Sequence, residues 1–187
     1  SANLYETKYK NMQTNTPGAI SGVNGFSNFG DATSKGVDYE IRWRAPVGGI
    51  TLGLVGNANT AEYDRVAPAV QQALPLFRPG SRLVNSILEN YRFDVGFNSR
   101  LFADVEGFGN VSYGRVGNRL QSSGLYADAY ALINATLGLR AGRYELALIG
   151  NNLADQRGPT FIGTAGPNSG QGPTPRTVSL RLRADFQ

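Results

Sequence analysis

The C-terminal stretch TVSLRLRADFQ, residues 177–187, alternates strictly between polar and apolar side chains. Apolar residues occupy every second position, and arginines and an aspartate are among the polar residues between them. A period of two residues predicts a β-strand whose two faces meet different surroundings. The pattern alone leaves open whether the apolar face packs on a protein core.

The same alternation recurs along the whole chain. In KGVDYEIRWRA, residues 35–45, apolar and aromatic side chains alternate with acids and arginines. The recurring pattern predicts an all-β protein, with an antiparallel meander of about eight strands in one domain that spans residues 1–187. The expected strands lie near residues 3–13, 34–45, 50–63, 89–101, 103–114, 128–140, 143–151 and 175–187.

The connections between the expected strands alternate in length. In a meander, this alternation puts every long loop at one end and every short turn at the other, as in membrane barrels. Most strands also have about the 9 to 11 residues that a tilted membrane strand needs. The short turns are residues 46–49, 101–103 and 141–143, and the long loops are residues 14–33, 64–88, 115–127 and 152–174.

Composition narrows the classes of function. Charged residues make up 17% of the chain, whereas about 25% is typical of soluble domains. The chain has no cysteine and no histidine, so thiol chemistry, the commonest general base and the commonest metal ligand are missing. We therefore expect no enzyme, no catalytic or metal site and no cofactor. The net charge of +4 is spread along the chain, which argues against a nucleic-acid partner.

One pair of acids is the nearest candidate for catalytic chemistry. Asp104 and Glu106 lie two residues apart in an expected strand, and paired carboxylates serve glycosidases and metal sites. Similar charges recur on the other expected strands. We therefore interpret the pair as part of a hydrated wall.

Two features favour lipid over a protein core beside the apolar faces. Those faces mix glycine and alanine with bulky residues, whereas a sandwich core needs matched, close-packed volume. The polar faces carry charges of both signs in mid-strand, which suits a wet lumen. The fold expected is thus part of a transmembrane β-barrel, or such a barrel closed on itself. The expected lumen-facing residues are Asp38, Glu40, Arg42, Arg44, Arg92, Asp94, Arg100, Asp104, Glu106, Arg181 and Arg183.

Aromatic residues gather near the ends of the expected strands. Two girdles at the two lipid–water boundaries would produce this distribution. Tyr63, Tyr91 and Tyr113 lie toward the long loops, and Trp43, Tyr144 and Phe186 lie toward the short turns.

Two long loops are candidates for ligand contact. One carries Arg115, Arg119 and Tyr126, which would suit an anionic ligand such as a metal chelate; solvated loop side chains are the alternative. The segment APAVQQALPLF, residues 67–77, has an apolar bias and predicts a short helix or a folded flap.

Four stretches, in this order along the chain, resemble segments of TonB-dependent outer-membrane receptors. NLYETKYKNMQ (3–13) is similar to a strand that precedes the others, and residues 30–64, from GDATSKGVDYE to NANTAEYD, resemble a hairpin of that family. YALINATLGLRAGRYELALIGNNLADQ (130–156) resembles the penultimate hairpin, which ends in an Asn-Leu-x-Asp run. PRTVSLRLRADF (175–186) resembles the closing strand.

The resemblance implies the C-terminal part of a barrel of about 22 strands, without the N-terminal plug and the earlier strands. It implies a receptor in the bacterial outer membrane that imports a scarce nutrient, typically a ferric siderophore, with energy from TonB delivered through the plug. Outer-membrane lipid, the missing plug and strands, and a small-molecule ligand would be its partners. The family's closing aromatic residue resembles an assembly signal, and Phe186 takes that position, although Gln187 follows it.

Two other interpretations stay open. One is an independent eight-stranded outer-membrane barrel with a structural or adhesive role. The other is a soluble carbohydrate-binding β-sandwich. An isolated arc would expose the backbone edges of strands 3–13 and 175–187, and closure would pair them.

Overall fold

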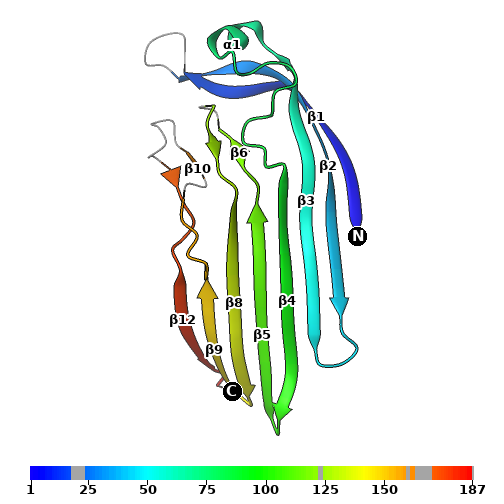
Figure 1. Cartoon of the computed structure of the whole chain (residues 1–187), viewed down its shortest axis with the longest axis vertical. Helices are drawn as coiled ribbons and strands as arrows, with labels where there is room; N and C mark the ends of the chain where they lie inside the picture. Colours follow the sequence, from blue (N-terminus) through cyan, green and yellow to red (C-terminus); the bar gives the residue numbers. More distant parts are fainter. Residues whose placement is uncertain (18–23, 122–123, 159–160, 163–169, 187) are drawn as a thin grey trace.

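The main body of the protein is a single antiparallel sheet of eight strands in the order β1-β2-β3-β4-β5-β8-β9-β12 (Figure 1). The computed structural model describes residues 1–17, 24–121, 124–158, 161–162 and 170–186. The long strands are β1 (Ala2–Pro17), β2 (Asn24–Arg44), β3 (Ile50–Val66), β4 (Glu89–Phe102), β5 (Val105–Val116), β8 (Tyr130–Ala141), β9 (Tyr144–Asn151) and β12 (Thr177–Ala184).

The smaller elements gather at the end of the sheet that carries the long connections (Figure 1). They are the helix α1 (Pro68–Ala73), the pair β6 (Arg119–Leu120) and β7 (Tyr126–Ala127), and the pair β10 (Phe161–Ile162) and β11 (Gly170–Gln171). Within the described ranges, no helix has the length and apolar content that crossing a bilayer requires.

The eight-stranded sheet is open. β1 and β12 stand at its two edges, and neither pairs with the other among the described residues. The chain therefore does not close on itself here as an independent barrel. The large sheet also has no second large sheet packed against it within the same ranges, which a sandwich would require.

The first hairpin is longer than the sequence pattern predicts. β1 continues to Pro17 and β2 begins at Asn24, so much of the expected loop 14–33 is strand. The pairing shifts register between Tyr9 and Met12. Such a bulge interrupts the period of two, which is why alternation does not reveal the extension.

The turn between β4 and β5 also differs from the expectation. The predicted strand begins at residue 103, but Ala103 has a φ of 44°, in the left-handed region that tight hairpin turns use. Asp104 follows it in the turn, and β5 begins at Val105.

One face of the sheet, which we call the leucine face, carries the apolar side chains. Residues that pair across neighbouring strands share a face of the sheet. One such row of partners crosses the sheet from β2 to β12 and contains Trp43, Leu52, Val95, Val111, Ala135, Gly150 and Val178. On β12, 73% of the surface of Leu182 is exposed. The leucine face comprises Ile41, Trp43, Leu52, Leu54, Phe93, Val95, Phe97, Val111, Leu137, Leu139, Leu146, Leu148, Val178, Leu180 and Leu182.

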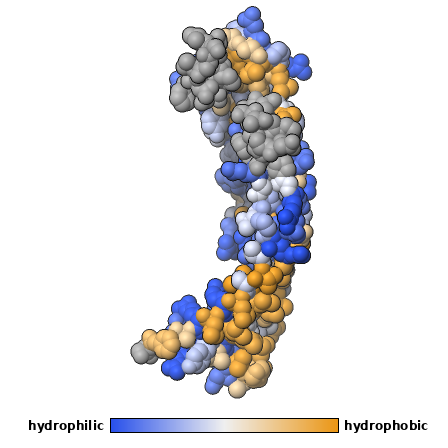
Figure 2. Space-filling model, turned by 90° about the vertical axis from the view of Figure 1, so that its left-hand side faces the viewer, coloured by the Kyte–Doolittle hydropathy of each residue, from blue (hydrophilic) through white to orange (hydrophobic). Residues whose placement is uncertain are grey.

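The opposite face, which we call the arginine face, carries the charges. In the lower half of Figure 2, hydrophobic atoms gather on one side of the sheet and hydrophilic atoms on the other. The arginine face comprises Asp38, Glu40, Arg42, Arg44, Arg92, Asp94, Arg100, Glu106, Arg140, Glu145, Arg181 and Arg183.

The hydrophobic core lies at the long-loop end. Phe29, Tyr63 and Phe77 pack their rings together, with centroids 4.9 Å apart between Phe29 and Tyr63 and 5.3 Å apart between Phe29 and Phe77. Val70 of α1 joins the same cluster, so the segment 67–77 forms the folded flap that the sequence predicts.

Tyr63 is not a girdle residue, contrary to the expectation from its place near a strand end. Only 3% of its surface is exposed, and burial raises the pKa of its hydroxyl. Tyr63 pairs with Ala32, which shares the face of Asp38, so the core covers the continuation of the arginine face. The ring of Tyr63 fills space between the sheet and the flap, where it packs against Phe77.

Gly138 provides a test of close strand packing. A Cβ there would lie 2.7 Å from Cε1 of Phe108 and 2.8 Å from the carbonyl oxygen of Leu146. We expect Gly138→Ala to lower the free energy of unfolding by about 1–3 kcal/mol, as overpacking does. Gly53 is the matched control on the same face, because its Cβ would meet no heavy atom nearer than 3.6 Å. Urea titration measures both, and equal losses for the two variants would contradict this packing.

Candidate functional site

A row of alternating charges crosses the arginine face near the short turns. Register pairs align Arg100, Glu106, Arg140, Glu145 and Arg183 on neighbouring strands. Arg140 lies 2.8 Å from Glu145 and 3.7 Å from Glu106. Exposed ion pairs contribute little individually, so the row organises a charged wall more than it stabilises the fold.

Further charge pairs continue across the same face. Arg181 of β12 lies 2.9 Å from Glu145, which therefore receives two guanidinium groups. On β4, Arg92 lies 2.7 Å from Asp94. The face thus presents both signs of charge within reach of solvent.

The residues expected to line a lumen share the arginine face, with one exception. Asp104 lies in the turn after β4 and not in a strand. Glu106 is on the arginine face, where it lies 3.7 Å from Arg140. Among the described residues, no group of three or more acids is placed to hold a metal ion.

A second candidate site is a pocket of about 450 Å³ between two long connections. Arg78 and Arg82, from the connection between β3 and β4, line it together with Tyr126 of β7. Two guanidinium groups beside a phenol ring suit an anionic or aromatic ligand. We call this the loop pocket; it is lined by Leu76, Arg78, Pro79, Gly80, Ser81, Arg82, Leu120, Gly124 and Tyr126.

Arg82 joins the two connections that form the loop pocket. Its Nη1 donates to Oδ1 of Asn118 at 2.7 Å, and its guanidinium carbon lies 5.7 Å from the centre of the Tyr126 ring. Burial lowers the pKa of Arg82. Sequence reasoning missed this residue, because one arginine in an irregular segment gives no periodic signal.

The structure separates the three loop residues that the sequence suggests for ligand contact. Tyr126 lines the loop pocket, and Arg119 pairs with Ala127 in the β6–β7 ribbon. Arg115 belongs to β5, where it aligns with Tyr91 at the end of the leucine face. It lies 3.5 Å from Glu89 and does not line the loop pocket.

The Asn-Leu-Ala-Asp run after β9 forms a clamp at the start of the last strand. The buried Asn152 donates from Nδ2 to the carbonyl oxygens of Gln156 at 3.0 Å and Thr174 at 2.9 Å. Asp155 accepts from the backbone N–H of Arg176, and the adjacent Arg157 guanidinium lowers the pKa of Asp155. The motif therefore sets where the chain re-enters the sheet.

Phe186 lies just beyond the end of β12 and is 82% exposed. Arg143 sits over its ring, with 5.9 Å between the guanidinium carbon and the ring centre. The backbone N–H of Asp185 donates to the carbonyl oxygen of Arg143 at 3.1 Å. The end of the chain is thus held against the short turn before β9.

Arg82→Gln tests the link between the two connections. Glutamine lacks the guanidinium fork that reaches Asn118 and Tyr126 together, so the β6–β7 ribbon should open more often. We expect faster amide hydrogen exchange over residues 118–127, with β4 and β5 unchanged. Arg78→Gln is the matched control, since it removes a charge from the same pocket but leaves these contacts in place; equal protection in the two variants would contradict the link.

Three solved structures share the architecture described above. The ferric yersiniabactin uptake receptor FyuA from Yersinia pestis matches with a TM-score of 0.78 and 24% identity, over 100% of this chain and 27% of that one. BauA, the ferric preacinetobactin receptor from Acinetobacter baumannii, matches with a TM-score of 0.67 and 12% identity, over 99% and 27%. The ferric-catecholate import receptor Fiu from K12 E. coli matches with a TM-score of 0.68 and 16% identity, over 99% and 25%.

These likenesses establish the fold, and the chain spans only about a quarter of the length of the structures it matches. A comparison with curated protein sequences gives no significant match. A family profile described as "TonB dependent receptor-like, beta-barrel" matches residues 1–153, which is most of the chain. The chain therefore belongs to the TonB-dependent receptor-like β-barrel family, a family of receptors and transporters.

Proposed function

We propose that this chain is the C-terminal part of the barrel of a receptor that imports a ferric siderophore across the bacterial outer membrane. Its family is one of transporters and receptors, and the three structural neighbours are named as receptors for ferric ligands. Import belongs to the complete receptor, because the chain covers about a quarter of those neighbours.

The leucine face is the observation that carries the proposal. Val178, Leu180 and Leu182 are 63%, 70% and 73% exposed, on a strand with no covering layer among the described residues. Exposing so much apolar surface to water is costly, at about 25 cal/mol per Å². A lipid environment removes that cost, so this face meets the hydrocarbon in the proposed receptor.

The arginine face lines the lumen in the same arrangement. Outer-membrane barrels alternate apolar residues toward lipid with polar residues toward a wet interior. The row of charged residues from Arg100 to Arg183 would present both signs of charge to the interior of the barrel. In a complete receptor, we assign the plug domain, which couples transport to TonB, to that place.

The edges of the sheet support a larger barrel. An unpaired strand edge invites aggregation, and closure is the usual remedy in membrane barrels. β12 would pair with the first strand of the complete barrel, and β1 with the strand that precedes it. Phe186, beyond the end of β12, would serve as the assembly signal.

The loop pocket is the part of this chain that we assign to ligand contact. It lies among the long connections, which face the outside in barrels of this class. Arg78 and Arg82 would pair with an anionic ferric chelate, and Tyr126 would stack on an aromatic part of it.

Leu182→Arg tests the proposed orientation in the bilayer. Arginine on the lipid face of a barrel costs about 2–4 kcal/mol near the bilayer midplane. The cost falls to about 0–1 kcal/mol near the interfaces. Leu182 lies two residues before the end of β12, so we expect a loss between these two values in the free energy of unfolding of the complete receptor in lipid vesicles. Arg181→Ala, on the neighbouring residue of the opposite face, should cost much less. Equal losses would show that the two faces have been assigned the wrong way round.

Growth on iron tests the transport function itself. A strain that lacks the receptor should fail to grow when one ferric siderophore is the only iron source, and the complete receptor should restore growth. Arg78→Gln with Arg82→Gln should raise the siderophore concentration needed for half-maximal growth. Arg42→Gln, on the lumen side far along the sheet, is the control for charge removal. Unimpaired growth of the deletion strain on all ferric siderophores tried, with loss of growth on a sugar or a cobalamin, would reject the iron assignment.

A further inference from the structure

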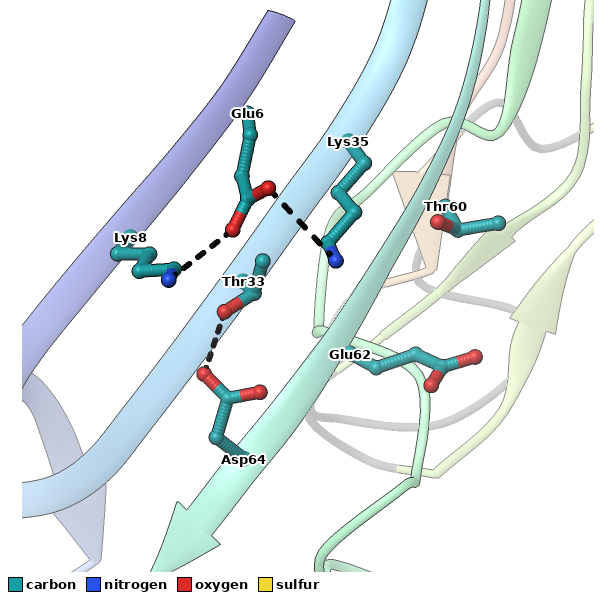
Figure 3. Close-up of a pocket in the computed structure, with 7 residues that line it drawn as sticks. All are labelled: Glu6, Lys8, Thr33, Lys35, Thr60, Glu62 and Asp64. Atoms are coloured by element: carbon teal, nitrogen blue, oxygen red, sulfur yellow. Dashed lines mark hydrogen bonds and ion pairs between the residues drawn. The ribbon is translucent and has the colours of Figure 1, made fainter.

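The leucine face changes from apolar to charged within one row of residues toward the long-loop end. Leu4, Val37 and Ala58 form its last apolar row across β1, β2 and β3. The next row on the same face is Glu6, Lys35 and Thr60, and the one after it is Lys8, Thr33 and Glu62. With Asp64, these two rows line a pocket of about 450 Å³ (Figure 3); we call its seven residues the lysine pocket.

The two lysines of this pocket are held by one carboxylate. Glu6 lies 3.1 Å from Nζ of Lys8 and 3.7 Å from Nζ of Lys35, so it spaces the two ammonium groups (Figure 3). Their side chains are 65% and 60% exposed. Each ammonium carries three N–H donors, and contact with Glu6 leaves donors of both available to a further acceptor.

The remaining acids of the pocket stand farther from the apolar band than Lys35 does. Glu62 lies in the second charged row, and Asp64 follows it along β3. Asp64 accepts a hydrogen bond from the hydroxyl of Thr33 at 2.5 Å. The carboxylate of Glu62 points away from Glu6 and the lysines (Figure 3). An anion that approaches from the apolar band therefore meets the row of Glu6 and Lys35 before it meets Glu62 or Asp64.

The other face of the sheet inverts at the same level. Beside these rows, Ala32, Ala61 and Tyr63 are buried on the continuation of the arginine face, where the flap packs. The lower sheet is apolar on the leucine face and charged on the other, and the upper sheet is the reverse. Such an inversion fixes where a lipid boundary crosses the strands.

We propose that Lys8 and Lys35 bind the phosphate of a lipid headgroup in the outer leaflet, on the outside of the barrel. This inference rests on the membrane orientation proposed above. Lys35 stands in the first charged row beyond the apolar band and Lys8 in the second. Their ammonium groups would thus lie at headgroup depth, as those of snorkelling lysines do. The two ammonium groups, held apart by Glu6, form a binding site for one phosphate. This site is separate from the nutrient site, which we assign to the loop pocket.

The test measures binding of a phosphorylated lipid to the complete receptor in detergent micelles. Diphosphoryl lipid A is the probe, with the same lipid after removal of its phosphates and inorganic phosphate as separate arms. Basic residues near a membrane surface contribute about fivefold each in affinity. We therefore expect Kd to rise about fivefold for Lys8→Gln or Lys35→Gln and about 25-fold for the double variant. Lys35→Arg should keep most of the affinity, which separates charge from folding.

Arg42→Gln is the matched control, because it removes a positive charge from the same strand but from the opposite face. It should leave Kd within twofold of the parent value. Equal Kd values for the parent and the folded double variant would overturn the proposal, and so would equal affinity for the dephosphorylated lipid. Full competition by inorganic phosphate at similar concentration would show a free-phosphate site instead of a lipid site. Growth on the ferric siderophore is measured in parallel, so failure of the lipid site is distinguishable from failure of the transport function.

Discussion

The structure depends on lateral backbone pairing in a sheet that lacks a covering layer over most of its area. Each of the six inner strands pairs with a neighbour on both sides, and the described residues supply no second large sheet to bury either face. The alternation of polar and apolar residues then determines what each face of the sheet can contact, because every second side chain in a strand points to the same face. The leucines require an apolar medium, and the arginines and acids require a wet one. A barrel wall between lipid and a hydrated lumen supplies both.

The inversion of polarity along β1, β2 and β3 divides the chain into two parts. Below it, the leucine face is apolar and the arginine face is charged; above it, Lys35 and Glu6 replace the apolar side chains, and Tyr63 is buried on the other side. The flap with α1 belongs to the upper part only. The long connections thus build a small core together with Phe29 and Tyr63 of the sheet, and Arg82 shapes the loop pocket within this upper part.

The sequence predicts the sheet well and the upper part poorly. Strands such as 89–101 follow a strict period of two, so the sequence alone predicts that they are strands and which residues share a face. The bulge near Met12 hides the extension of the first hairpin, and the left-handed φ of Ala103 moves Asp104 out of its expected strand. The burial of Tyr63 depends on a flap that contacts it from elsewhere in the chain, and Arg82 acts through partners in another loop. Neither contact leaves a local pattern.

The proposed function requires that the leucine face meets lipid and that the arginine face meets water. The chain has no cysteine, so one cysteine introduced at a time can carry a spin label at a chosen position in it, once any cysteine in the rest of the receptor has been replaced. Labels at Leu182→Cys and Arg181→Cys, in the complete receptor reconstituted in vesicles, report accessibility to oxygen, which concentrates in lipid, and to a water-soluble nickel chelate. We expect high oxygen and low nickel accessibility at position 182 and the reverse at position 181. Equal accessibility to nickel at both positions, or the opposite order, would contradict it.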